Sequence, residues 1–196
     1  MKIHQIAFVL ALLTGCSSQA PDERTTPLVT KPEPQTPSPV PAIPEVTLKA
    51  ASLDEVQAAI AKHKGKVVIC DYWSTSCEPC VKEFPHLVAL SQKHSADHLV
   101  CVSASLDFDG LDKLETYREP VLTFLKEKHA TIENYLLSDD DTAVYAKLKI
   151  ASIPAVYVYG ADGKLKQRFD ESSGKPFSYE KDINPLVEEL VKATAK

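Results

Sequence analysis

Basic residues are in the minority in this sequence, which has 22 lysines and arginines against 27 aspartates and glutamates and a formal net charge of −5. Because nucleic-acid-binding domains usually carry a basic patch, this balance argues against binding to DNA or RNA. The chain also lacks a long internal hydrophobic run, and a transmembrane helix needs about 20 consecutive apolar residues. These two absences predict a domain that does not bind nucleic acid and has no internal membrane span.

Cysteine is scarce too, with five residues in the chain, and only Cys77 and Cys80 are spaced as Cys-x-x-Cys. A structural zinc site needs four ligands, whereas Cys70 and Cys101 stand alone in apolar runs. A purely structural disulfide between Cys77 and Cys80 is also disfavoured, because so short a loop gains little from chain entropy. We expect neither a metal nor a cofactor, and redox chemistry at Cys77 and Cys80 is the remaining interpretation.

The residues around this cysteine pair predict where it lies in the fold. The continuous apolar run Val67–Trp73 indicates a strand covered on both faces, Ser74–Ser76 form a turn, and a helix begins at Cys77. Pro79 suits the first turn of that helix, where its missing N–H leaves no hydrogen bond unmade. Cys77 then lies at a helix N-terminus, which stabilises a thiolate, and Cys80 is placed to resolve a mixed disulfide. The stretch predicts a dithiol/disulfide redox centre.

The other two cysteines of the domain, Cys70 and Cys101, fall in predicted neighbouring strands. A disulfide between them is conceivable in an oxidising compartment. Disulfide geometry is narrow, however, and adjacent strands rarely satisfy it without strain. We therefore expect two buried thiols, which is the usual state of a free cysteine in a protein core.

The N-terminal quarter of the chain differs in composition from the rest. Lys2 followed by the apolar stretch Ile6–Leu13 indicates a secretory signal peptide in residues 1–15. That stretch ends in Leu-Thr-Gly-Cys, which resembles the bacterial lipobox and implies lipidation of Cys16; a plain signal peptide with a chance cysteine is the alternative. Residues 16–45 hold eight prolines, a composition typical of an extended spacer that does not fold.

The folded domain is expected at residues 46–196, where the apolar patterns predict alternating helices and strands. Ser52 begins a helix with a capping-box sequence. The acidic cluster Asp139–Asp141 suits a helix N-terminus rather than a calcium loop, because it lacks the alternating oxygen ligands of an EF-hand. The expected strands are 67–73, 99–104, 135–137, 155–159 and 164–169, and the expected helices begin near 53, 78, 120, 142 and 184. This order predicts an α/β fold that ends in a hairpin and a helix.

The stretch W-S-T-S-C-E-P-C-V-K-E-F-P-H-L, with Pro85 eight residues after Cys77, resembles the active-site segment of thioredoxin-like proteins. It is most similar to the extracytoplasmic TlpA/ResA branch of thiol-disulfide oxidoreductases. The segment Ser-Ile-Pro-Ala-Val resembles the cis-proline segment of the same family, so Pro154 is expected to be cis and to lie against the disulfide. The resemblance implies a thioredoxin-like α/β fold, with a central mixed β-sheet flanked by helices.

The resemblance also implies roles for individual residues. Cys77 is the expected nucleophile and Cys80 the resolving cysteine. Asp71 matches the buried acid beneath the thioredoxin disulfide, Glu83 matches an active-site glutamate of ResA-like members, and the two acids are expected to relay the proton that Cys80 loses. The family usually has tryptophan where this chain has Ser76, and this departure predicts a wetter surface beside Cys77.

The predicted function is that of an extracytoplasmic thiol-disulfide oxidoreductase that reduces disulfides of client proteins and is held by the lipid on Cys16 at the periplasmic side of a membrane. Ser17, rather than aspartate, follows Cys16 and favours the outer membrane where the cell has one. We expect a monomer whose partners are protein disulfide substrates and a thiol donor that the sequence does not identify. A dithiol oxidase or isomerase of the envelope and a non-catalytic thioredoxin-like binding module are the alternatives.

Overall fold

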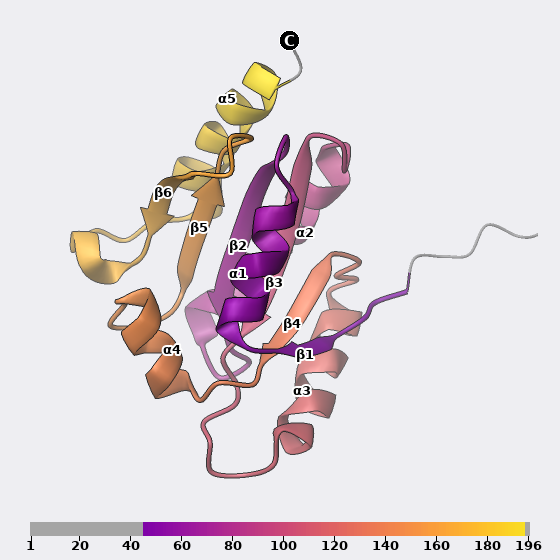
Figure 1. Cartoon of the computed structure of the whole chain (residues 1–196), viewed down its shortest axis with the longest axis vertical. Helices are drawn as coiled ribbons and strands as arrows, with labels where there is room; N and C mark the ends of the chain where they lie inside the picture. The colour runs from indigo at the N-terminus through magenta and orange to yellow at the C-terminus, as the bar shows by residue number, and fades with distance from the viewer. Residues whose placement is uncertain (1–44, 195–196) are drawn as a thin grey trace, which may run out of the picture. The chain divides into compact units, whose positions relative to one another are not determined.

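A computed structural model of the protein describes residues 45–194 (Figure 1). The signal peptide, the lipidated Cys16 and nearly all of the proline-rich linker fall outside this range and stay predictions. The described residues form a six-stranded sheet in the order β1-β4-β3-β2-β5-β6. Its strands are β1 (Lys49–Ala51), β2 (Val67–Trp73), β3 (Leu99–Ser105), β4 (Glu133–Leu137), β5 (Ala155–Tyr159) and β6 (Leu165–Phe169).

Helices cover both faces of this sheet. They are α1 (Leu53–Lys62), α2 (Glu78–Lys93), α3 (Leu114–Glu127), α4 (Asp141–Leu148) and α5 (Asn184–Thr194), with a short 3₁₀ helix η1 (Glu171–Ser173) and a π-helix η2 (Tyr179–Ile183). Side chains of α1 and α4 pack on one face, and those of α2, α3, η2 and α5 pack on the other. Strands β1 to β4 pair in parallel, whereas β5 is antiparallel to β2 and β6 is antiparallel to β5. This arrangement confirms the expected α/β fold with a central mixed sheet flanked by helices.

Strand β2 lies between β3 and β5, and all seven of its residues are buried. Its continuous apolar sequence predicted this burial, because helices cover both of its faces. Successive side chains alternate between the faces, so Ile69, Asp71 and Trp73 point toward α2 and η2. Trp73 packs on Phe84 of α2 with their ring centroids 4.7 Å apart, and this contact anchors the start of α2 against the end of the strand.

At some helices the local sequence sets the first residue, and at others tertiary packing sets it. Helix α1 begins as predicted: the backbone N–H of Glu55 donates to Ser52 Oγ and that of Ser52 donates to Glu55 Oε2, which is the capping box. Helix α3 begins at Leu114, before the expected start at Pro120, and that prediction was wrong. Leu114 and Tyr117 pack against the core, and this burial outweighs the cost of an internal proline. Strand β1 and helix η2 were not predicted.

The carboxyl ends of β2 and β3 and the start of β5 meet at one edge of the sheet. Trp73 pairs with Ser105 of β3, and Tyr72 pairs with Ala155 of β5. The segment after β2, which holds the Cys-x-x-Cys pair, therefore lies beside the loop after β3 and beside Pro154, which precedes β5. The topology brings three distant segments of the chain to this edge.

Candidate active site

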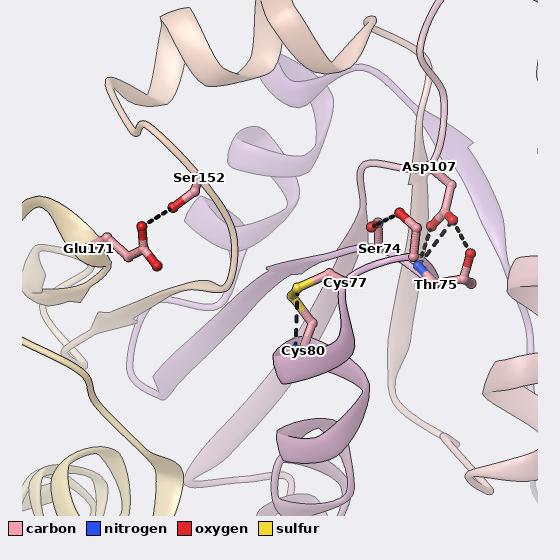
Figure 2. Close-up of a disulfide and its surroundings, with 8 residues drawn as sticks. Ser74, Thr75, Cys77, Cys80, Asp107, Ser152 and Glu171 are labelled. Carbon is pink, nitrogen blue, oxygen red and sulfur yellow. Dashed lines mark hydrogen bonds between the residues drawn. A yellow bond between two sulfur atoms is a disulfide. The ribbon is translucent and has the colours of Figure 1, made fainter.

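Cys77 and Cys80 form a disulfide at the N-terminus of α2 (Figure 2). Cys77 is the N-cap residue, and its Sγ accepts a hydrogen bond from the backbone N–H of Cys80 at 3.3 Å. Cys77 is half-buried, whereas Cys80 is 2% exposed. Free N–H groups and the helix dipole stabilise a negative charge at this position. Cys77 is therefore the more accessible of the two cysteines and the one placed where the helix favours a thiolate.

Asp107, just beyond the end of β3, holds the turn that precedes Cys77 in place through hydrogen bonds. Its carboxylate accepts hydrogen bonds from the backbone N–H of Thr75 at 3.0 and 3.2 Å, from the Thr75 hydroxyl, and from Ser105 Oγ at 2.6 Å. Figure 2 shows this cluster on one side of the disulfide. No motif in the sequence marks Asp107 as part of the site; a carboxylate just after a predicted strand was the signal available.

A groove of about 420 Å³ lies on the other side of the disulfide. The Ile153–Pro154 peptide bond is cis, as expected, and Pro154 lines the groove together with Pro79, which stands between the two cysteines. The remaining lining residues come from the segment after β6: Glu171, Gly174, Lys175, Pro176 and Phe177. Ser152 Oγ donates a hydrogen bond to Glu171 Oε2 at 2.7 Å (Figure 2) and so ties this segment to the loop that carries Pro154.

Asp71 is 3% exposed and lies on the face of β2 that α2 and η2 cover. Burial raises the pKa of Asp71 to about 7; the hydrogen bond that the Tyr179 hydroxyl donates to Asp71 Oδ2 at 2.7 Å opposes this rise, and the charge of Glu83 adds to it. Asp71 Oδ1 has no hydrogen-bond partner among residues 45–194. A carboxyl group that titrates near neutral pH can accept a proton from a thiol.

Glu83, in the second turn of α2, is hydrogen-bonded to the same residue, Tyr179. Its Oε2 accepts a hydrogen bond from the backbone N–H of Tyr179 at 3.0 Å. The two acids that the resemblance singled out are thus joined through one residue of η2. Tyr179 follows Glu83 by 96 residues and Asp71 by 108 residues, and sequence reasoning missed it because no local pattern marks a contact over that separation.

The remaining cysteines of the domain are free and buried, as predicted. Cys70 and Cys101 lie in neighbouring strands but belong to the cores on opposite faces of the sheet, which keeps their sulfurs apart. Burial raises the pKa of both thiols, to about 12 for Cys101, so both are protonated and unreactive at neutral pH.

His94 and His98 form a His-x-x-x-His pair, a zinc-ligand spacing that the prediction against a zinc site did not take into account. His94 Nε2 lies 3.0 Å from Glu188 Oε1. Within residues 45–194, no group of three or more histidine, cysteine, aspartate or glutamate side chains is arranged to hold a metal ion.

A family model named Redoxin matches residues 39–184, which is most of the chain and includes the cysteine pair and the cis-proline. The chain belongs to the Redoxin family. This Redoxin protein is 28% identical over 127 residues to Thioredoxin-like protein YneN of Bacillus subtilis, a match that covers 63% of this chain and 66% of YneN. It is 26% identical over 128 residues to Thiol-disulfide oxidoreductase ResA of Oceanobacillus iheyensis, covering 64% of this chain and 62% of that relative.

Among solved structures, a thiol:disulfide interchange protein from Chlorobium tepidum aligns with a TM-score of 0.50 at 20% identity, over 67% of this chain and 83% of that one. This likeness supports the thioredoxin-like fold. Together with the relatives, it confirms the prediction of a thioredoxin-like protein of the ResA type. The Redoxin protein spans 66% of the length of YneN and 62% of the length of ResA from Oceanobacillus iheyensis.

Proposed function

We propose that this Redoxin protein is a thiol-disulfide oxidoreductase that reduces disulfides of client proteins through Cys77 and Cys80. The observation that carries the proposal is the disulfide at the N-terminus of α2, which joins half-buried Cys77 to buried Cys80 beside the groove that cis-Pro154 lines. The relative ResA of Oceanobacillus iheyensis is named a thiol-disulfide oxidoreductase, which supports the same activity. A non-catalytic binding module would have no use for a cysteine pair in this geometry.

The reaction begins with the reduced protein. The Cys77 thiolate attacks one sulfur of a client disulfide and forms a mixed disulfide, while the other client sulfur leaves as a thiolate and takes a proton from water. The N-terminus of α2 assists because it stabilises the Cys77 thiolate before the attack. The half-exposed position of Cys77 lets a bulky client approach.

The second step releases the client. Cys80 gives its proton to the Asp71 carboxylate and attacks the Cys77 sulfur, and the second client sulfur leaves as a thiolate. Two electrons have then passed from the protein to the client, and Cys77 and Cys80 are left as the disulfide that the structure contains. Asp71 suits the task because burial raises its pKa to about 7, and Glu83 contributes through its charge. A separate thiol donor must then reduce the pair.

The groove beside the disulfide is the proposed binding site for the client chain. Pro79, Pro154, Pro176 and Phe177 give it apolar walls, and Glu171 and Lys175 add one charge of each sign. An extended client segment with an apolar residue next to its cysteine matches this lining. The Ser152–Glu171 hydrogen bond holds the two sides of the groove together.

Reduction of insulin tests the activity. The reduced wild-type protein should reduce the interchain disulfides and precipitate the B chain, Cys77→Ser should be inactive, and Cys80→Ser should accumulate a mixed disulfide through Cys77. Cys70→Ala is the matched control, because Cys70 is a buried free thiol on the other face of the sheet. The proposal is wrong if the wild-type protein leaves insulin intact and Cys80→Ser traps no client.

The redox potential of the cysteine pair decides between a reductase and an oxidase. A glutathione titration with thiol trapping should give a value near the thioredoxin end of a range from about −270 to −120 mV. A value near that of DsbA, at the other end of the range, would favour the oxidase or isomerase instead.

We also propose that the protein is monomeric and is anchored at the extracytoplasmic face of a membrane through lipid on Cys16, in the outer membrane where one exists. The lipobox-like sequence and the eight prolines of residues 16–45 support this placement. Several acyl chains on one cysteine would give a stable anchor, which a single chain does not. No helix within residues 45–194 is long and apolar enough to cross a membrane.

A further inference from the structure

We propose that Tyr179 is a positioning residue that holds Asp71 and Glu83 in one hydrogen-bonded unit and thereby sets the pH range over which Cys80 can be deprotonated. The inference rests on the proposed function, because it concerns the group that accepts the Cys80 proton. It assigns a role to a residue of η2, an element that the redox motif does not include.

Tyr179 reaches the two acids with two different donors. Its hydroxyl donates to Asp71 Oδ2 at 2.7 Å, and its backbone N–H donates to Glu83 Oε2 at 3.0 Å. It is the first residue of η2, and the first N–H groups of a helix have no partner inside the helix. The Glu83 carboxylate satisfies this free N–H, so the start of η2 is held against α2 and aims the tyrosine ring at β2.

Asp71 depends on this one donor. The groups that act on its ionisation are the Tyr179 hydroxyl from η2 and the Glu83 carboxylate from α2. The buried thiols of Cys70, on its own strand, and of Cys101, on β3, lie within range of the Asp71 charge but are themselves uncharged at neutral pH. The ring of His86 in α2 stacks on that of Tyr179, with the ring centroids 6.2 Å apart. Tyr179 is 1% exposed, so water does not replace its hydroxyl readily. Without the hydroxyl, an ionised Asp71 would lose the only hydrogen-bond donor it has among residues 45–194.

Two substitutions should move the titration of Asp71 in opposite directions. Tyr179→Phe removes the hydrogen-bond donor to the Asp71 carboxylate. The midpoint of the Asp71 titration should then rise from about 7 by about one pH unit, which is a tenfold change in proton affinity. Glu83→Gln keeps an oxygen for the Tyr179 N–H but removes the charge that disfavours ionisation, and should lower the midpoint. General loosening of the fold would not produce shifts of opposite sign.

The titration is measured by NMR on the oxidised full-length protein with ¹³C-labelled aspartate carboxyl groups, and Asp71→Asn identifies the Asp71 signal. The disulfide stays intact in this measurement, so it does not depend on the proposed activity. A second measurement follows the pH dependence of mixed-disulfide resolution in a single turnover with an insulin-derived peptide. Tyr157→Phe is the matched control, because its hydroxyl donates to the Leu148 carbonyl at 3.1 Å in the core on the other face of the sheet.

The proposal holds if Tyr179→Phe raises the Asp71 midpoint, Glu83→Gln lowers it, Tyr157→Phe leaves it unchanged, and the pH midpoint of resolution moves with it. It fails if neither substitution moves the Asp71 midpoint, if both move it the same way, or if resolution does not follow. Glu83→Gln removes no buried hydroxyl and keeps the test decisive should Tyr179→Phe not fold. If the wild-type protein shows no disulfide exchange, the proposed function fails, and the NMR titration still decides whether Tyr179 controls Asp71.

Discussion

Asp71→Asn should make the protein more stable above neutral pH while it slows the release of a reduced client. Burial raises the pKa of Asp71 to about 7 from its ordinary value of 3.8. The stability that its bound proton contributes is therefore fully present below about pH 4 and is lost as the pH rises through 7. At 1.36 kcal/mol per pKa unit, this group alone lowers the free energy of unfolding by about 2.5 kcal/mol between pH 5 and pH 8. Asparagine does not titrate and escapes this loss.

Urea unfolding of the oxidised protein at pH 5 and pH 8, followed by the fluorescence of the single tryptophan, Trp73, measures the effect. The stability of Asp71→Asn relative to the wild type should increase by about 2.5 kcal/mol from the lower to the higher pH. Asp112→Asn, at an exposed position in the loop before α3, should show the wild-type pH dependence. An equal difference at both pH values would mean that Asp71 does not titrate in this range, and Asp71 could then not be the acceptor of the Cys80 proton.

Three further substitutions test the anchor, the surface and the turn at the site. Cys16→Ala should release the domain from membranes or leave its precursor uncut in a fractionation experiment; a correctly cut, membrane-bound mutant would contradict lipidation. Ser76→Trp should raise insulin turnover, because it adds an apolar surface beside Cys77, and should change the pH dependence of Cys77 alkylation little; the reverse pattern would refute this account of Ser76. Asp107→Ala should cost about 1–3 kcal/mol of stability by leaving the Thr75 donors without their acceptor; an unchanged urea midpoint would show that the turn does not need this anchor.

Local pattern was enough to predict the central part of the site. The run of β2 has the same bounds in the structure as in the prediction, because a strand covered on both faces is apolar along nearly its whole length; Asp71 is the one charged residue in it. The helix after it begins where Pro79 and the capping position of Cys77 place its first turn. The same local rules failed at α3, where Pro120 indicated a start and packing of Leu114 moved it earlier.

The sequence by itself determined the dithiol chemistry that we propose for this protein, because the spacing of Cys77 and Cys80 at a helix start is a property of neighbouring residues. The tertiary structure alone decided the surroundings of that chemistry. The contact of Asp71 with Tyr179 joins residues 108 positions apart, and the groove joins Pro79 and Pro154 to the segment after β6. Such contacts follow from strand order, register and the docking of η2 on the sheet, and no periodicity in the chain encodes them. Burial beneath η2, rather than the identity of the residue, is what raises the pKa of Asp71 into the range that thiol chemistry needs.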